Sequence, residues 1–321
     1  MNTRILTSPE DLDRYDRWLK SSGLGNLWQS LERKAYLEAL GKEVRIYVSE
    51  DDTHIHTSAL VVTDRTTGGY CTWEIPRGPI GDGAKLLEKI IDDAKADKCL
   101  ALYLSPSAPL ITDWKSLTLS PRHIHCEATR IIDLTQSEED ILSQMKQKGR
   151  YNIKVAKKNN ITIKESSDID AFYNLVTKTG KRDGFVHLSK NKYEAFLQCN
   201  PGSFLLLAYD KQTEPIAGVL SVVWGERLIY YYGASNHAER AKMAPYLLQW
   251  ESMRIGKAKG CTEYDLLGVA PPESSKTHPW AGISSFKEKF GGEVVMYPKE
   301  QMIILKPIAY HLLRIKRSLL G

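Results

Sequence analysis

The chain has few cysteines and no long apolar run. Its 321 residues include five cysteines, which are scattered and form no Cys-x-x-Cys pair (Cys71, Cys99, Cys126, Cys199 and Cys261). An odd, dispersed set of cysteines is typical of reduced thiols and argues against a structural zinc site. No segment reaches the roughly 18 apolar residues that a membrane-spanning helix needs, so the sequence excludes a membrane span.

Two further signals are missing. Residues 1–20 lack the apolar core of a secretory signal, so we expect a cytoplasmic protein, with contact at the inner face of the membrane left open. The pairs His54/His56 and His123/His125 have the alternate spacing of a strand face, but no third ligand follows nearby. We therefore expect no metal site.

The overall composition is that of a globular protein. The sequence is 42% hydrophobic and 26% charged, with a formal net charge of +5. A length of 321 residues predicts two domains, because single domains usually contain about 100 to 200 residues. The mild positive charge is compatible with a nucleic-acid partner but does not require one.

The two halves of the chain repeat one pattern of predicted elements. Each half contains three strands with turn signals between them, then an amphipathic helix, then a further strand. The predicted elements are 44–50, 58–64, 68–79, 83–99 and 100–105 in the first half, and 204–210, 216–225, 228–235, 244–261 and 262–269 in the second. This order resembles the GCN5-related N-acetyltransferase fold, present twice. We expect an α/β (α+β) protein with mixed, mostly antiparallel sheets flanked by helices.

The predicted domains are residues 1–145 and 146–299. The basic amphipathic segment 300–321 is expected to complete the first domain by packing against it, although its positive face also suits an anionic lipid surface. The second domain is expected to hold the catalytic cleft.

A basic stretch opens the second domain. Residues 146–158 contain six basic side chains and no acid, and in a helix four of them form one stripe: Lys146, Arg150, Lys154 and Lys158. Like charges at this spacing repel one another unless a polyanion binds. We interpret the stripe as an RNA contact; the alternative is a solvated helix face.

The coenzyme A signature is absent. N-acetyltransferases hold the pyrophosphate on a glycine-rich turn at the start of the central helix. The corresponding segment, 240–245, reads RAKMAP, with Met243 and Pro245 in place of glycines. A side chain blocks close approach and proline has no N–H to donate. The sequence therefore combines an acyltransferase fold with an acyl donor other than coenzyme A.

Four ordered motifs resemble the FemABX aminoacyltransferases of peptidoglycan synthesis, which are tandem acetyltransferase-like proteins. They are KGRYNIKVAKKNNITI, YYYGASNHAERAKMAPYLLQWESM, EYDLLGV and FKEKFGGEVVMY, between Lys146 and Tyr297, with fainter similarity in PRGPI and LWQSLERKAYLEALGK. The segment Asp168–Pro215 is too short for a long helical hairpin, so the chain is similar to the compact FemX type.

The resemblance implies a function. An aminoacyl-tRNA donates Gly, Ala or Ser to the stem-peptide amine of a peptidoglycan precursor, either UDP-MurNAc-pentapeptide or its lipid-linked form, and the interpeptide bridge is built. Aminoacyl-tRNA is then a co-substrate, and no separate cofactor is expected. The amino acid, the acceptor form, the proton acceptor and the oligomeric state stay open.

The resemblance also implies site residues. The pair Phe286-Lys287 matches the Phe-Lys pair whose lysine stabilises negative charge during transfer in the family. Tyr230 and Tyr232 match tyrosines that lie at the substrate; their alternation predicts a shared strand face, with Tyr231 packing on the other side.

Further substrate contacts are implied with departures from the family pattern. In the loop 187–196 the tyrosine matches at Tyr193, but Ser189 stands where an arginine holds a phosphate in the family; Lys190 or Lys192 could substitute as a point charge. In the first domain Arg77 and Asp82 are candidates for precursor binding. Ser105 stands where the family often has an acid.

Two other functions remain open. One is an acyl-CoA-dependent N-acetyltransferase, which the turn at Met243 and Pro245 opposes. The other is a non-catalytic protein of the same fold that binds RNA or a cell-envelope precursor, whose function would survive the loss of Lys287.

Overall fold

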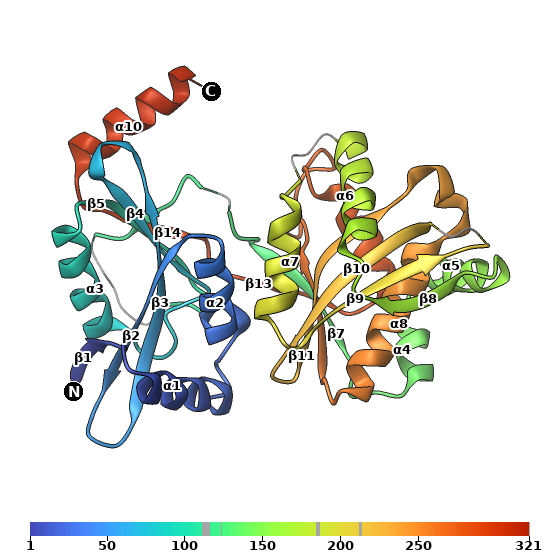
Figure 1. Ribbon diagram of the computed structural model, residues 1–321, viewed down its shortest axis with the longest axis horizontal. Helices are drawn as coiled ribbons and strands as arrows, with labels where there is room; N and C mark the ends of the chain where they lie inside the picture. Colours follow the sequence, from blue (N-terminus) through green and yellow to red (C-terminus); the bar gives the residue numbers. More distant parts are fainter. Residues whose placement is uncertain (111–115, 123, 184–186, 212–213, 321) are drawn as a thin grey trace. The chain divides into compact units, whose positions relative to one another are not determined.

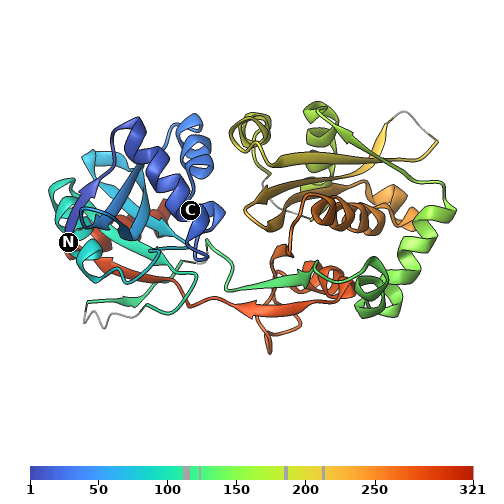
Figure 2. The ribbon, with the colours of Figure 1, turned by 90° about the horizontal axis from the view of Figure 1, so that it is seen from below.

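The computed structural model describes residues 1–110, 116–122, 124–183, 187–211 and 214–320. The chain forms two compact units, one made of Met1–His125 with Tyr297–Gly321 and one made of Cys126–Met296 (Figures 1 and 2). Within the described residues, no helix is both long enough and apolar enough to cross a membrane.

The first unit is built on a seven-stranded sheet in the order β1-β2-β3-β4-β5-β14-β6. All neighbouring strands are antiparallel except β4 and β5, which are parallel and are joined by the helix α3 (Ala84–Ala96). The strands are β1 (Asn2–Ile5), β2 (Glu43–Glu50), β3 (Ile55–Arg65), β4 (Cys71–Pro76), β5 (Cys99–Ser105), β6 (Thr118–Leu119) and β14 (Gln301–Ile304).

Helices cover this sheet with apolar faces. The buried side of α3 carries Leu86, Leu87, Ile90 and Ile91 at helical spacing, and these pack with Trp73 in one core cluster. The other helices of the unit are α1 (Pro9–Ser21), α2 (Leu31–Ala39) and α10 (Pro307–Leu320), with 3-10 turns at Leu27–Gln29 and Thr67–Gly69.

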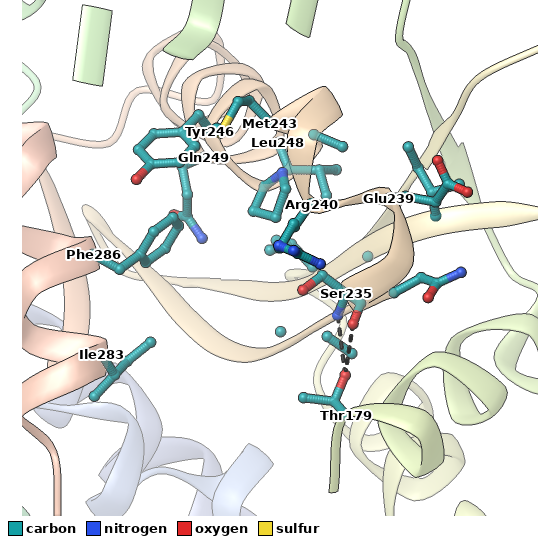
Figure 3. Close-up of a pocket in the computed structure, with 18 of the residues that line it drawn as sticks. Thr179, Ser235, Glu239, Arg240, Met243, Tyr246, Leu248, Gln249, Ile283 and Phe286 are labelled. Carbon is teal, nitrogen blue, oxygen red and sulfur yellow. Dashed lines mark hydrogen bonds between the residues drawn. The ribbon is translucent and has the colours of Figure 1, made fainter. Parts of the chain in front are cut away.

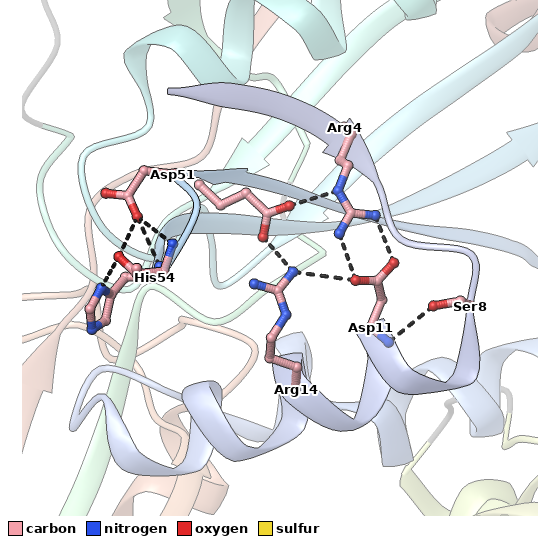
Figure 4. Close-up of polar contacts among 8 residues, drawn as sticks. Arg4, Ser8, Asp11, Arg14, Asp51 and His54 are labelled. Carbon is pink, nitrogen blue, oxygen red and sulfur yellow. Dashed lines mark hydrogen bonds and ion pairs between the residues drawn. The ribbon is translucent and has the colours of Figure 1, made fainter.

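An ion-pair network ties the start of the chain to this unit (Figure 4). Arg4 on β1 makes two hydrogen bonds to Asp11, of 2.7 and 2.6 Å, and a third of 2.6 Å to Glu50, to which Arg14 also donates at 2.5 Å. The hydrogen bonds from Arg4 hold the pKa of Asp11 well below its ordinary value. The Ser8 hydroxyl accepts the N–H of Asp11 and caps α1.

The second unit repeats the plan with the strand order β13-β7-β12-β11-β10-β9-β8. Its one parallel pair among the described strands is β11 with β12, joined by α8 (Ala244–Ala258). The strands are β7 (Ala128–Asp133), β8 (Thr162–Ser166), β9 (Ser203–Tyr209), β10 (Pro215–Trp224), β11 (Arg227–Ser235), β12 (Glu263–Gly268) and β13 (Glu293–Met296).

The core of the second unit lies between this sheet and α8. Leu247, Leu248, Trp250 and Met253 are buried on α8 and pack with Tyr264 of β12. The remaining helices are α4 (Glu138–Gln144), α5 (Gln147–Lys158), α6 (Ile169–Asp183), α7 (Lys190–Cys199) and α9 (Ala281–Lys287), with 3-10 turns at His237–Lys242 and Glu288–Phe290.

The predicted duplication of three strands, a helix and a strand is present as β2-β3-β4-α3-β5 and β9-β10-β11-α8-β12, which confirms the fold class. The units divide at 125/126 and 296/297, whereas the boundaries predicted from the sequence are 145/146 and 299/300. The difference arises because β7 pairs with β12 and β13, so that 126–145 belongs to the second unit.

Candidate active site

Lys287 is the last residue of α9 and points into the second unit. Its side chain is 5% exposed, and the ammonium Nζ donates to the backbone carbonyls of Gly268 at 2.7 Å and Leu267 at 3.2 Å. Nζ also lies 5.6 Å from the centre of the Tyr230 ring. A lysine this deeply buried is uncommon, since a charged head group normally stays in water.

Burial changes the acidity of this group. Desolvation lowers the pKa of Lys287 from 10.5 to about 8, against the opposing attraction of Asp265. The ammonium therefore predominates at neutral pH but releases its proton under mildly alkaline conditions. Burial also raises the pKa of the Tyr230 hydroxyl to about 12, so that this phenol stays protonated.

Lys287 lines a small cavity of about 220 Å³ in the second unit. The cavity is lined by three consecutive tyrosines and by residues of four other segments: Val176, Tyr193, Tyr230, Tyr231, Tyr232, Gly233, Leu267, Ile283 and Lys287. Four residues that the resemblance singled out, Lys287, Tyr193, Tyr230 and Tyr232, thus meet here although they come from three separate elements. Their roles stay a prediction.

The predicted shared face of Tyr230 and Tyr232 is wrong. Tyr230 pairs with Ser221 and Tyr232 with the next residue, Leu220, so a bulge in β11 places the two tyrosines on opposite faces of the sheet. Tyr231 is the extra residue of the bulge. It packs on Phe196 with ring centres 4.2 Å apart, as predicted, and it also lines the cavity.

The tyrosines on the α7 side form an aromatic cluster. The rings of Tyr193 and Tyr232 meet edge to face at 4.9 Å, and Tyr231 and Tyr232 meet at 4.8 Å. Tyr230, on the opposite face, lies over Gly233, where an added Cβ would come within 2.0 Å of the Tyr230 hydroxyl oxygen. A side chain at 233 therefore cannot coexist with this placement of Tyr230.

A larger cavity of about 1210 Å³ adjoins the first (Figure 3). Tyr230, Gly233 and Ile283 line both cavities. Phe286, the residue before Lys287, lies on the wall of the larger one and packs on Tyr246 with ring centres 5.1 Å apart. The Phe-Lys pair is thus divided, because Phe286 lines the larger cavity and Lys287 lines the smaller one.

The start of α8 borders this larger cavity. Met243 adopts a left-handed conformation with φ of 56°, and Pro245 lies in the first turn of the helix, where it offers no N–H. Across the cavity, Thr179 exchanges two hydrogen bonds with the backbone of Ser235, of 3.1 and 3.2 Å (Figure 3). Gln249 is buried on the same wall, where its Oε1 accepts the hydroxyl of Tyr264 at 2.6 Å.

The two lysines proposed as phosphate contacts lie elsewhere on α7. Lys190 forms ion pairs with Asp170 at 2.6 Å and Glu194 at 3.4 Å, and neither Lys190 nor Lys192 is among the described residues lining the two cavities. Ser189 occupies the cap position before α7. These lysines therefore do not line the cavity of Lys287, and their proposed contact with a phosphate stays a prediction.

Arg77 and Asp82 differ sharply in environment within the first unit. Arg77 is buried with φ of 51°, and its guanidinium carbon lies 3.7 Å from the centre of the Tyr297 ring. Its backbone carbonyl accepts the side-chain amide of Asn26 at 3.0 Å. Asp82 is exposed. Their proposed contact with the precursor stays a prediction.

Ser105, which replaces the acid of the family pattern, has an acid beside it. Its hydroxyl donates to Glu300 Oε2 at 2.8 Å, and Arg122 donates to the same carboxylate at 2.9 and 3.0 Å. A carboxylate thus reaches this position from another part of the chain, and the sequence motif alone could not reveal it.

The basic stripe begins at Lys146, the residue before α5, and continues along that helix, and its members have different surroundings. Lys146 pairs with Glu288, and Arg150 donates to the carbonyls of Ser143, at 3.1 Å, and Met145 at the end of α4. The segment thus has an acidic neighbour that its own sequence does not show. Lys154 and Lys158 are exposed, as are three neighbours on the helix, Lys148, Tyr151 and Lys157.

The described histidines form no metal centre. His56 binds Asp51 at 2.6 Å and His125 binds Glu74 at 2.5 Å, while His123 lies outside the described residues. Among the described residues, no group of three or more His, Cys, Asp or Glu side chains is arranged to hold a metal ion.

Comparison with known proteins shows the family. The model of the FemAB family matches residues 11–112, 109–209 and 205–317. The chain therefore belongs to the FemAB family, as the motifs predicted.

Individual relatives agree with this assignment. The chain is 22% identical to a lipid II:glycine glycyltransferase of Staphylococcus saprophyticus, over 77% of this chain and 80% of that protein. A protein of the same name from Staphylococcus aureus strain MRSA252 is 20% identical, over 86% of this chain and 87% of its own length. These relatives are named as transferases of an amino acid, and the predicted class of enzyme, an aminoacyltransferase, is confirmed.

Solved structures confirm the fold. The crystal structure of FemX superposes with a TM-score of 0.84 at 18% identity, covering 97% of this chain and 99% of that one. A tandem GNAT protein from the clavulanic acid biosynthesis pathway superposes with a TM-score of 0.57 at 8% identity, covering 95% and 98%. The second of these is named as a tandem GNAT protein, in agreement with the duplication of elements described under the overall fold.

Proposed function

We propose that the protein transfers an amino acid from an aminoacyl-tRNA to the stem-peptide amine of a peptidoglycan precursor, and so forms the interpeptide bridge. The observation that carries the proposal is the buried Lys287, which lines the smaller of two adjoining cavities of the second unit. Membership of the FemAB family supports the same reaction.

The reaction places charge where Lys287 can stabilise it. The acceptor amine attacks the ester carbonyl, a C–N bond forms, and the C–O bond to the ribose breaks. Negative charge develops on the carbonyl oxygen and then on the ribose oxygen, which finally takes the proton that the amine releases. A fixed cation beside these oxygens stabilises them without having to reorganise. The backbone carbonyls of Leu267 and Gly268, which accept hydrogen bonds from Lys287, hold the ammonium in place.

The two cavities suit two substrates. The larger cavity, with Phe286 and Tyr246 on its wall, has room for the terminal nucleoside and ester of the donor. The smaller, lined by tyrosines, has room for an extended amine-bearing side chain. We assign the donor to the first and the acceptor to the second, since Lys287 then lies beside the carbonyl at which they react.

The choice of donor rests on α8 and α5. Pro245 and the left-handed Met243 remove the free N–H groups that would bind a pyrophosphate, which opposes coenzyme A. Lys154 and Lys158 present exposed charge on α5 to a polyanion such as tRNA. For the acceptor, the staphylococcal relatives are named for lipid II, and we propose a precursor of this type, either lipid-linked or as the soluble nucleotide.

We also propose contact with the inner face of the membrane through α10. Tyr310 packs into the first unit, whereas Ile308 and Leu312, on another side of the helix, are 81% and 62% exposed. From Gln301 onward the sequence contains basic residues but no acid. An exposed apolar stripe flanked by positive charge fits an anionic lipid surface.

The proposal is tested by supplying donors and acceptors in pairs. Purified protein is incubated with glycyl-, alanyl- or seryl-tRNA, or with acetyl-CoA, each labelled in the acyl group, and with either UDP-MurNAc-pentapeptide or lipid II. We expect label on the precursor from at least one charged tRNA and none from acetyl-CoA. Transfer from acetyl-CoA alone would establish an acetyltransferase instead.

A further inference from the structure

The strand β12, whose last carbonyls accept hydrogen bonds from Lys287, is irregular at one point. In the pairing of β12 with β7, the register shifts between Asp265 and Gly268. Leu267, inside this bulge, has φ of 54°, which is a left-handed conformation that residues other than glycine rarely adopt. Such a conformation persists only where surrounding contacts enforce it.

Asp265 supplies those contacts. Its side chain is fully buried, and its Oδ1 accepts the backbone N–H of Leu267 at 2.7 Å and the hydroxyl of Thr129 on β7. Its Oδ2 is buried and has no hydrogen-bond partner among the described residues. A buried carboxylate that leaves one oxygen unpaired is unfavourable, and a structural role alone would be served better by an amide or a hydroxyl.

The bulge is hydrogen-bonded to the ammonium of Lys287. The carbonyls of Leu267 and Gly268 accept hydrogen bonds from Lys287 Nζ at 3.2 and 2.7 Å. Asp265 and Lys287 therefore act on the same turn, one holding its N–H and the other its carbonyls. The helix α9 is fixed to the same strand exit, because Ser284 accepts the N–H of Ala270 at 2.7 Å.

Asp265 and Lys287 each favour the charged form of the other. The groups that act on the Lys287 ammonium are the carboxylate of Asp265 and the thiol of Cys126, and the Tyr230 ring lies against it. Burial lowers the pKa of Lys287, and Asp265 is the larger of the two opposing influences. Burial likewise raises the pKa of Asp265, while Thr129, the Leu267 N–H, Arg227 and Lys287 favour its ionised form.

We infer that Asp265 is a positioning residue for Lys287. Its hydrogen bond to Leu267 fixes the bulge whose carbonyls hold the Lys287 ammonium, and its carboxylate favours the charged form of this lysine. The catalytic consequence rests on the proposed aminoacyl transfer, but the link between the two side chains does not.

The test replaces the carboxylate by its amide in Asp265→Asn. The amide oxygen can still accept from Leu267 and Thr129, so this variant removes the charge and keeps the turn. The matched control is Glu263→Gln on the same strand, whose carboxylate is partly exposed and pairs with Arg227 at 2.6 Å. Lys287 is dimethylated with formaldehyde and a borane reductant across a pH series, and its modification is measured by peptide mass spectrometry.

We expect the pH at which dimethylation of Lys287 is half-maximal, its midpoint, to fall by about one pH unit or more in Asp265→Asn. The midpoint should stay unchanged in Glu263→Gln. Turnover at neutral pH should fall more than tenfold, with KM changed less than twofold. An unchanged midpoint in Asp265→Asn would overturn the inference, whether or not any transfer activity has been found. If transfer is absent in the wild type but the midpoint shifts, only the proposed function fails.

A second variant covers the case in which Asp265→Asn does not fold. Thr129→Val keeps the carboxylate but removes one donor to Oδ1, which makes the ionised form of Asp265 less favourable. The midpoint of Lys287 should move in the same direction by a smaller amount. An unchanged Lys287 midpoint in a folded Thr129→Val protein contradicts the inference.

Discussion

Replacement of Lys287 by methionine separates catalysis from folding. Methionine fills much of the volume of the lysine stem but carries no charge. If the ammonium stabilises the developing oxyanion, its loss should reduce turnover by roughly 100- to 1000-fold, or about 2.7–4 kcal/mol, which is the effect of removing one such donor in other acyl-transfer sites. KM should change little, because the lysine interacts mainly with the charge of the transition state.

The pH dependence of turnover provides a second signature of the same group. With the pKa of Lys287 lowered to about 8, the ammonium form is about 90% populated at pH 7 and about 10% at pH 9. Turnover of the wild type should therefore decline between these values. The residual activity of Lys287→Met should lack this decline.

The same substitution affects stability in a defined direction. Lys287 has a lower pKa in the folded protein, about 8, than its ordinary 10.5, so between these values the unfolded chain binds more protons. The free energy of unfolding of the wild type relative to Lys287→Met should therefore rise with pH across this window, by roughly 3 kcal/mol in total. Below pH 8 the buried charge destabilises the folded wild type by that amount. Chemical unfolding followed by circular dichroism at pH 7 and pH 10 measures the difference.

The matched control is Lys289→Met. Lys289 lies two residues further on, is only partly buried and bonds to Ser285, and it is not among the described residues lining the cavities. Its turnover should stay within about twofold of the wild type. Turnover above a third of the wild-type value in Lys287→Met, or equal losses in both variants, would refute the reasoning.

Three further outcomes are expected. Gly233→Ala should displace the Tyr230 ring and lower stability by about 1–3 kcal/mol in chemical unfolding, with loss of turnover. Lys154→Glu with Lys158→Glu should weaken binding of charged tRNA at least tenfold and reduce its salt dependence, measured by filter binding at several salt concentrations. Leu312→Glu should abolish sedimentation with phosphatidylglycerol vesicles, and wild-type protein should not sediment with purely zwitterionic vesicles.

Each of these variants has a matched control. Gly282→Ala introduces the same methyl group where nothing lies within 4 Å and is the control for stability alone, because Gly282 lines the larger cavity. Lys95→Glu reverses an exposed charge on α3, and Leu119→Glu replaces a leucine that is 64% exposed on β6. Equal stability, equal tRNA binding or equal vesicle sedimentation in a variant and its control would contradict the corresponding prediction.

Much of the fold could be predicted from the sequence because its signals are local. The repeated order of strands and helix follows from β-branched runs, turn residues and helical spacing such as that of Leu86, Leu87, Ile90 and Ile91, and the structure contains both copies. The domain boundary depends on long-range pairing instead. Nothing in 128–133 alone shows that it pairs with strands more than a hundred residues later.

Some features of the candidate site could likewise be predicted from the sequence, and others could not. Lys287 and Phe286 could be found because they belong to a contiguous motif. The faces of Tyr230 and Tyr232 could not, because a bulge depends on the partner strand and reverses the alternation. Asp265 stood in a motif, but its link to Lys287 runs through backbone atoms, which no residue pattern reveals.

The most direct test of the account is mass spectrometry of the precursor after incubation with charged tRNA. We predict a mass increase of one amino-acid residue on the stem-peptide amine with wild-type protein, and at least a hundredfold less product with Lys287→Met. An acetyl increment that requires acetyl-CoA, or equal products from both proteins, would contradict it.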